Sequence, residues 1–262
     1  MNTERASYCR LKAREHEIDS YLGALFAPEP KRQDLWALQA FTAELARIPA
    51  LVSEPMLGEI RLQWWREALE GLFAGKTAPH PVIEALAEAL TRTPFSAAPF
   101  ERLIDAHAQE LHPASIDSAA ALSAYLRATG IDLLALAVAI VEPAADDAVA
   151  GLIETGGRVQ GLARLLRRLP AQGAQNRIPL SAELLAKTGH LAQEALAGFD
   201  AAKAGFRSLH SPQLLPGFLP VSLARPLLVK AAQKGADPLA VREAPLLLRQ
   251  LNMIGIMMHG RL

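Results

Sequence analysis

The chain has a single cysteine, no excess of either charge and no long hydrophobic run. Cys9 alone excludes an internal disulfide and fits a reducing compartment. Lysine plus arginine and aspartate plus glutamate number 27 each, so no overall positive field would recruit nucleic acid. The longest uncharged apolar run, Leu133 to Val141, is shorter than the roughly 20 residues that a membrane span needs. We therefore expect a soluble protein with no transmembrane segment and no nucleic-acid partner.

We expect neither a targeting segment nor a linker. The first five residues include an early acid, Glu4, and no apolar core, so they resemble neither a secretory nor a mitochondrial leader. No stretch rich in Pro, Gly and Ser divides the chain, and 262 residues can bury one sizeable core. The sequence predicts a single domain over residues 1–262 in the cytoplasm, with peripheral attachment at a membrane left open.

Apolar residues recur at helical spacing along most of the chain, and the alternating runs typical of strands are missing. One stripe that shares a helix face consists of Leu35, Leu38, Phe41, Leu45 and Ile48. Prolines divide the chain into periodic runs, among them those at positions 55, 81, 143, 170 and 238. We expect about nine or ten helices, packed as a compact all-α bundle.

Three segments resemble the squalene/phytoene synthase family: residues 37–50 (ALQAFTAELARIPA), 64–69 (WWREAL) and 157–168 (GRVQGLARLLRR). The resemblance implies a single-domain isoprenoid-synthase-like helical bundle with a central cavity. In active members, two Asp-x-x-x-Asp pairs on facing helices hold magnesium against two isoprenoid diphosphates. Acids four residues apart project from one helix face, and magnesium prefers hard oxygen ligands.

The acids of both pairs are replaced in this chain. The first pair aligns with Ala46 and Ala50, and the second with Arg168 and Gln172. Pro170 lies within the second pair and fits poorly in an uninterrupted helix. The resemblance therefore predicts no metal site, no cofactor and no catalytic residue.

Further differences favour the non-catalytic branch of the family, which includes a mitochondrial assembly factor for respiratory complex I. The tyrosine-rich turn of active members aligns with residues 125–128, where Tyr125 remains and Ala128 replaces the tyrosine usually given a catalytic role. The branch pattern is matched at residues 8–9, 21–22, 40–41, 44–46, 52–54, 61–63, 65–66, 160–161, 166–167 and 218–219. The resemblance implies a helper in complex I assembly whose partner is a membrane-associated subunit or assembly intermediate. An isoprenyl diphosphate transferase whose acids moved elsewhere, or an isoprenoid-binding protein, remains the alternative.

A basic cluster follows one face of the second motif segment. It consists of Arg164, Arg167 and Arg168, and with Arg61, Arg66 and Tyr125 it supplies the candidates for binding an anion, an isoprenoid or an anionic lipid. A buried guanidinium needs a partner. Either an internal acid (Glu44, Asp105 or Glu110) pairs with the arginines and plugs the site, or the cavity stays open for an anionic head group. We favour the plug.

The remaining polar residues receive ordinary structural interpretations. His107 and His112 are five residues apart, which turns them away from a common helix face, so we expect surface or capping roles rather than a metal pair. Asp105 and Glu110 fall where active members carry a further acidic segment and could line the cavity, but we favour a solvated helix face for them. The apolar last helix, residues 246–258, is expected to pack against the bundle.

Overall fold

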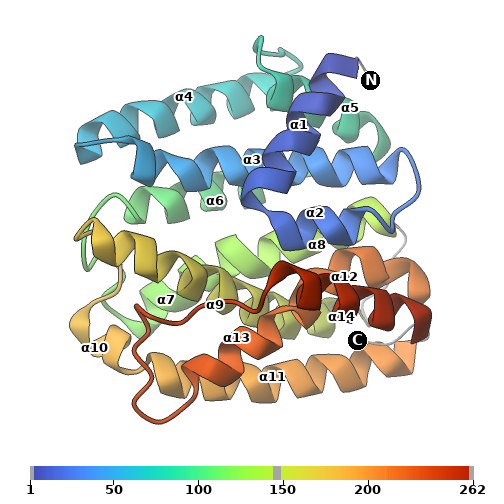
Figure 1. Cartoon of the computed structure of the whole chain (residues 1–262). Helices are drawn as coiled ribbons and strands as arrows, with labels where there is room; N and C mark the ends of the chain where they lie inside the picture. Colours follow the sequence, from blue (N-terminus) through green and yellow to red (C-terminus); the bar gives the residue numbers. More distant parts are fainter. Residues whose placement is uncertain (1–2, 144–148, 210, 260–262) are drawn as a thin grey trace.

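The computed structural model describes residues 3–143, 149–209 and 211–259, and helices dominate all three segments (Figure 1). The first six helices are α1 (Thr3–His16), α2 (Ile18–Ala24), α3 (Lys31–Leu51), α4 (Pro55–Phe73), α5 (Pro81–Arg92) and α6 (Ala98–Gln109). The chain continues through α7 (Ala119–Leu126), the π-helical turn η1 (Arg127–Asp132), α8 (Leu133–Val141) and α9 (Ala150–Ala174). The last elements are α10 (Ala182–Ala186), α11 (Thr188–Leu209), the 3-10 turn η3 (Pro212–Leu214), α12 (Leu215–Ser222), α13 (Ala224–Ala231) and α14 (Leu246–His259).

The helices form two stacked groups. Figure 1 shows α3, α4 and α6 in the upper half of the molecule and α9, α11 and α13 in the lower half, with α1 crossing α3. Within the described residues, the sole strand-like pairing is an isolated bridge between Ile116 and Leu180. The predicted all-α helical bundle is therefore confirmed.

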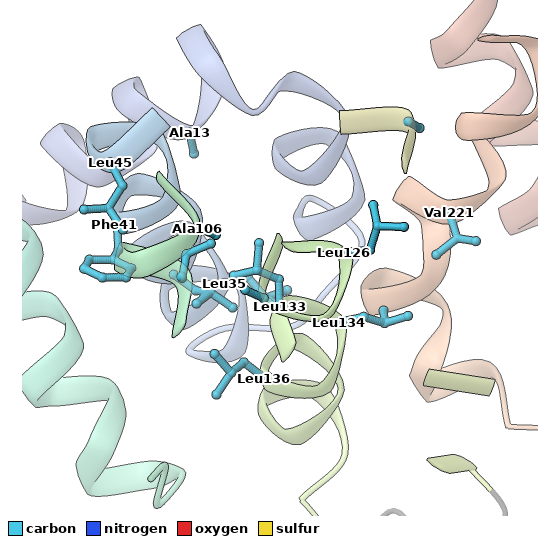
Figure 2. Close-up of a cluster of buried hydrophobic side chains, with 14 of the residues drawn as sticks. Ala13, Leu35, Phe41, Leu45, Ala106, Leu126, Leu133, Leu134, Leu136 and Val221 are labelled. Atoms are coloured by element: carbon cyan, nitrogen blue, oxygen red, sulfur yellow. The ribbon is translucent and has the colours of Figure 1, made fainter. Parts of the chain in front are cut away.

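The hydrophobic core follows the predicted stripe of α3. Leu35, Phe41 and Leu45 are at most 2% exposed, because they occupy the helix face that packs on α1, α5 and α6. Figure 2 shows the same cluster extending through Leu133 and Leu134 of α8 to α12. One continuous core thus holds both groups of helices and fixes how α3 and α9 face each other.

The predicted number of nine or ten helices is wrong, since the described residues form fourteen α-helices. The extra ones, such as α2, α10, α12 and α13, have eight residues or fewer and are too short to show a clear period. Pro170 does not end a helix either, because α9 continues through it to Ala174. Its neighbours Leu166 and Leu169 are fully buried, and burying such side chains offsets the roughly 3 kcal/mol that an interior proline costs.

Two helical segments are long and apolar enough to cross a membrane by length and composition, in contrast to the expectation from the longest apolar run. They are Ala119–Val141 and Pro212–Ala231, and 72% and 78% of their most apolar windows are buried inside the bundle. Core helices of soluble proteins pass the same test, so these segments are weak evidence for a membrane span.

A close helix crossing brings α9 against η1 and depends on glycine. A Cβ atom added at Gly157 would lie 2.4 Å from the Cα atom of Ile131, and one added at Gly130 would lie 2.0 Å from the carbonyl oxygen of Gly157. Both obstacles are backbone atoms, which cannot move aside as a flexible side chain would. These glycines therefore set the distance between α9 and the turn that precedes α8.

We expect Gly157→Ala to lower the free energy of unfolding by at least about 2 kcal/mol, because overpacking against backbone forces α9 away from η1. The matched control is Gly151→Ala on the same helix, where an added Cβ meets nothing within 4 Å. This control should leave stability unchanged or slightly raised. Urea unfolding followed by circular dichroism measures both values, and equal effects of the two substitutions would contradict the close crossing.

Candidate functional site

The four replaced motif positions meet around one cavity. Ala46 and Ala50 approach it from α3, and Arg168 and Gln172 approach it from α9. The cavity has a volume of about 330 Å³, and its lining also includes Glu110. The structure therefore brings together the residues that the resemblance aligned with the two acidic pairs, although they lie more than a hundred positions apart in the sequence.

A buried polar network fills the α9 side of this cavity. An Nη atom of Arg168 lies 3.2 Å from an oxygen of Glu110, and the same guanidinium donates a hydrogen bond of 2.6 Å to the hydroxyl of Tyr125. That hydroxyl donates in turn to Glu110 at 2.7 Å. Gln172 donates to the other carboxylate oxygen at 3.1 Å. Glu110 and Tyr125 are each 1% exposed, so this carboxylate obtains its partners from the protein rather than from water.

The network keeps a buried carboxylate ionised. Burial raises the pKa of Glu110, but the opposing effects of Arg168, His107 and Tyr125 are larger together and lower this pKa from 4.5 to about 2. Burial is also the main reason why the pKa of Tyr125 is raised and that of His107 is lowered. At neutral pH the result is an ionised Glu110 paired with a charged Arg168, beside a neutral phenol and a neutral imidazole.

The other two arginines of the basic face are paired as well. Arg164 lies 2.9 Å from a carboxylate oxygen of Glu17. Arg167 lies 2.8 Å from Asp19 and also forms an ion pair with Glu243, from the segment before α14. A neighbouring cavity of about 160 Å³ lies among these side chains. Each guanidinium of the cluster therefore has a carboxylate of this chain beside it.

These residues do not fit the magnesium ions that the resemblance implies for active members. The methyl groups of Ala46 and Ala50 supply no ligand, and the guanidinium of Arg168 would repel a cation. Glu110 is the one carboxylate in the lining of the larger cavity, and its oxygens already accept hydrogen bonds from Tyr125 and Gln172. No step of a magnesium-dependent reaction can be assigned to these side chains.

The space deeper among the core helices is narrow. A cavity bordered by residues of α2, α3, α8, α9 and α12 has a volume of about 30 Å³. This volume is much smaller than that of either cavity beside the motif positions. In the described part of the chain, the larger spaces beside the motif positions lie next to polar and charged side chains.

The structure does not bring the remaining candidates to this site. Arg66 forms a surface ion pair of 2.7 Å with Asp105, and Arg61 is exposed on α4; neither lines the two cavities beside the basic face. Asp105 is solvated as expected, with 65% of its side chain exposed. Glu44 contacts Tyr8, Lys12 and Arg47 instead of the arginines of α9.

Two interpretations from the sequence were wrong. Glu110 does not belong to a solvated helix face, because it follows the last turn of α6 and is directed into the bundle. His107 is neither a surface nor a capping histidine, since it is 0% exposed and its Nδ1 atom lies 3.1 Å from Glu110. His112 is on the surface beside Glu59, as expected. Spacing along one helix could not reveal that a second helix covers this face.

Several residues of the site had no clear signal in the sequence. Arg177 donates to the carbonyl oxygens of Pro49, Val52 and Ser53 and so holds the end of α3 beside the cavity. Three more residues contribute charge to the basic face: Asp19, Glu243 and Arg249. Glu243 precedes α14, which contains Arg249, so helical periodicity could not connect them.

The helical bundle has the isoprenoid-synthase fold. The four motif positions around its cavity carry no acid. The squalene/phytoene synthase family model matches residues 13–250, and the chain belongs to this family. Among solved structures, a dehydrosqualene synthase in complex with ligand is similar, with a TM-score of 0.73 at 16% identity over 98% of this chain and 96% of that one. At this identity the likeness shows the shared fold.

Two relatives illustrate the range of the family. The chain is 29% identical over 185 residues to NADH dehydrogenase (ubiquinone) complex I, assembly factor 6, of Rattus norvegicus, which is 70% of this chain and 54% of the relative. It is 31% identical over 112 residues to 15-cis-phytoene synthase of Synechococcus elongatus, which is 42% of this chain and 35% of that enzyme. The chain thus spans about half the length of the assembly-factor relative.

We expect Arg168→Ala to lower the free energy of unfolding by about 3 to 5 kcal/mol at pH 7, because it leaves the buried Glu110 without its cation. The matched control is Arg158→Ala, also on α9, which removes an exposed ion pair with Glu154. This control should cost less than about 1 kcal/mol. Urea unfolding measures both, and similar losses for the two variants would contradict a buried pair.

The pH dependence of the free energy of unfolding provides a second test of the Arg168→Ala variant. The pKa of Glu110 in the folded protein is lowered, so its stabilisation is complete above pH 4.5 and is lost as the pH falls toward 2. Without Arg168, the effect of burial on the pKa of Glu110 dominates, so the variant lacks this stabilisation already at neutral pH. The stability difference between wild type and Arg168→Ala should therefore shrink between pH 5 and pH 2.

Proposed function

We propose that this protein is a non-catalytic member of its family that assists the assembly of respiratory complex I. The observation that carries the non-catalytic part is the buried ion pair of Arg168 with Glu110 at the motif face. An active site of this kind needs metal ions that neutralise a departing diphosphate. Here one motif position is a cation, and the neighbouring carboxylate is committed to that cation.

The assembly role rests on similarity to assembly factor 6 of complex I. That similarity extends over 70% of this chain, whereas the similarity to a phytoene synthase extends over 42%. A protein that works by binding a partner needs the helical scaffold but not the metal ligands, because one fold can host unrelated functions. The proposed partner is a complex I subunit or assembly intermediate at the membrane, and the proposed location is cytoplasmic and peripheral to that membrane.

An isoprenyl diphosphate transferase, or an isoprenoid-binding protein, is the second candidate. The basic face favours it, because Arg164, Arg167 and Arg168 lie beside cavities of about 160 and 330 Å³. Guanidinium groups bind phosphate oxygens well. This candidate requires Glu17, Asp19 and Glu110 to release the arginines, which would leave buried carboxylates unpaired. The plugged, non-catalytic form is therefore favoured.

We expect the purified protein not to release diphosphate from farnesyl or geranylgeranyl diphosphate when magnesium is present. The reason is that Ala46, Ala50, Arg168 and Gln172 supply no carboxylate for the metal. A coupled assay of diphosphate release measures this, with an active phytoene synthase as positive control and the heat-inactivated protein as background. Release above background that a chelator abolishes would favour the transferase.

The assembly role is tested by deleting the coding sequence in cells that carry this protein. We expect membranes of the deletion strain to lose NADH dehydrogenase activity and assembled complex I, while the isoprenoid profile stays unchanged. Wild-type protein should restore both. An altered isoprenoid profile with normal complex I would overturn the proposal.

A further inference from the structure

The last helix, α14, exposes an apolar face and buries a charge. The residues on its outer face are Leu247, Leu251, Ile254 and Met258, which are 65%, 56%, 48% and 79% exposed. At 100° per residue these four positions lie within about 60° of one another. No polar side chain falls among them, so α14 presents a continuous hydrophobic stripe that nothing in the described part of the chain covers.

The rotation of α14 about its own axis is fixed from beneath. Arg249 is 9% exposed and forms ion pairs with Asp19 of α2 and with Glu243. Met253, one turn further on, is 1% exposed. Turning the stripe inward would pull the Arg249 guanidinium from both carboxylates, which is costly for buried charges. The ion pairs therefore hold the hydrophobic stripe on the outside.

Cations lie beside this stripe. A groove of about 1140 Å³ runs along α14 and reaches Leu251, and its lining includes Lys203 and Arg207 of α11 and Arg225 of α13. Among the described residues of that lining, Asp200 is the one that carries a carboxylate. Within the described residues none of these three cations forms an ion pair, so their charges are available to an external anion.

We propose that α14 and the adjacent cations dock the protein on an anionic phospholipid bilayer. A helix that lies in a membrane surface places apolar side chains among the acyl chains and cations at the head groups, and here α11 and α13 supply the cations. A second copy of this chain fits less well, because a two-fold contact would bring the same cations together. A protein partner would have to supply both an apolar core for the stripe and acids for the three cations, whereas an anionic bilayer supplies both over its whole surface. The inference rests on the proposed peripheral location and deepens it by naming the surface that binds the membrane, while its test is separate from that of the assembly role.

The test is co-sedimentation of the whole chain with vesicles of phosphatidylcholine alone or mixed with phosphatidylglycerol. We expect binding to the mixed vesicles that weakens as salt is added. The double substitution Leu247→Glu and Leu251→Glu should weaken it at least tenfold, because both side chains leave the acyl region. Arg207→Ala with Arg225→Ala should weaken it about fivefold per cation on mixed vesicles only.

A matched control uses Met56→Glu and Ile60→Glu on α4, a helix that Figure 1 shows at the top of the molecule and away from α14. These side chains are 66% and 62% exposed. The control therefore also replaces two apolar side chains by glutamate, at an exposure comparable with that of Leu247 and Leu251. The control should bind vesicles as the wild type does, and circular dichroism should show that all variants are folded. No binding by wild type, or equal losses in both double variants, would overturn the proposal. A dimer that only the α14 variant dissociates, without vesicle binding, would assign the face to a second copy.

Discussion

The arrangement of the site depends on pairing the arginines of α9 with carboxylates inside the bundle. A guanidinium away from water is costly unless an acid lies beside it, and Arg168 meets this requirement through Glu110. Because Glu110 comes from the end of α6 and Tyr125 from α7, this requirement joins three helices around one charge. The arginines of the basic face therefore stabilise the helix packing as well as forming a candidate site.

The same pairing places an internal ion pair at the face where the resemblance aligns the acids of a metal site. Where four acids would share magnesium, the structure has two methyl groups, an amide and a guanidinium around a cavity of about 330 Å³. The buried carboxylate of Glu110 stays ionised because Arg168 lies beside it, and the pKa of Glu110 is lowered accordingly. The scaffold of the family is retained, while the four aligned positions carry one cation and no acid.

The ion pairs also reach the other end of the chain. Asp19 receives Arg167 from α9 and Arg249 from α14, and Glu243 contacts both of these arginines. The basic face of α9 and the helix that carries the outer hydrophobic stripe, α14, are thus connected through the carboxylates of Asp19 and Glu243. A change at one is expected to be felt at the other, because residues in a shared ionic network do not act independently.

The sequence by itself determined the helical class, the stripe of α3 and the absence of acids at positions 46, 50, 168 and 172, because periodicity and residue identity are local properties. It could not reveal that α9 continues through Pro170, since the burial that offsets the cost of the proline comes from other helices. Only the tertiary structure decided that Glu110, and not Glu44 or Asp105, faces Arg168, and that α14 turns its leucines outward. Partners across a bundle depend on how helices are rotated and stacked, and helical spacing within one segment does not contain that information.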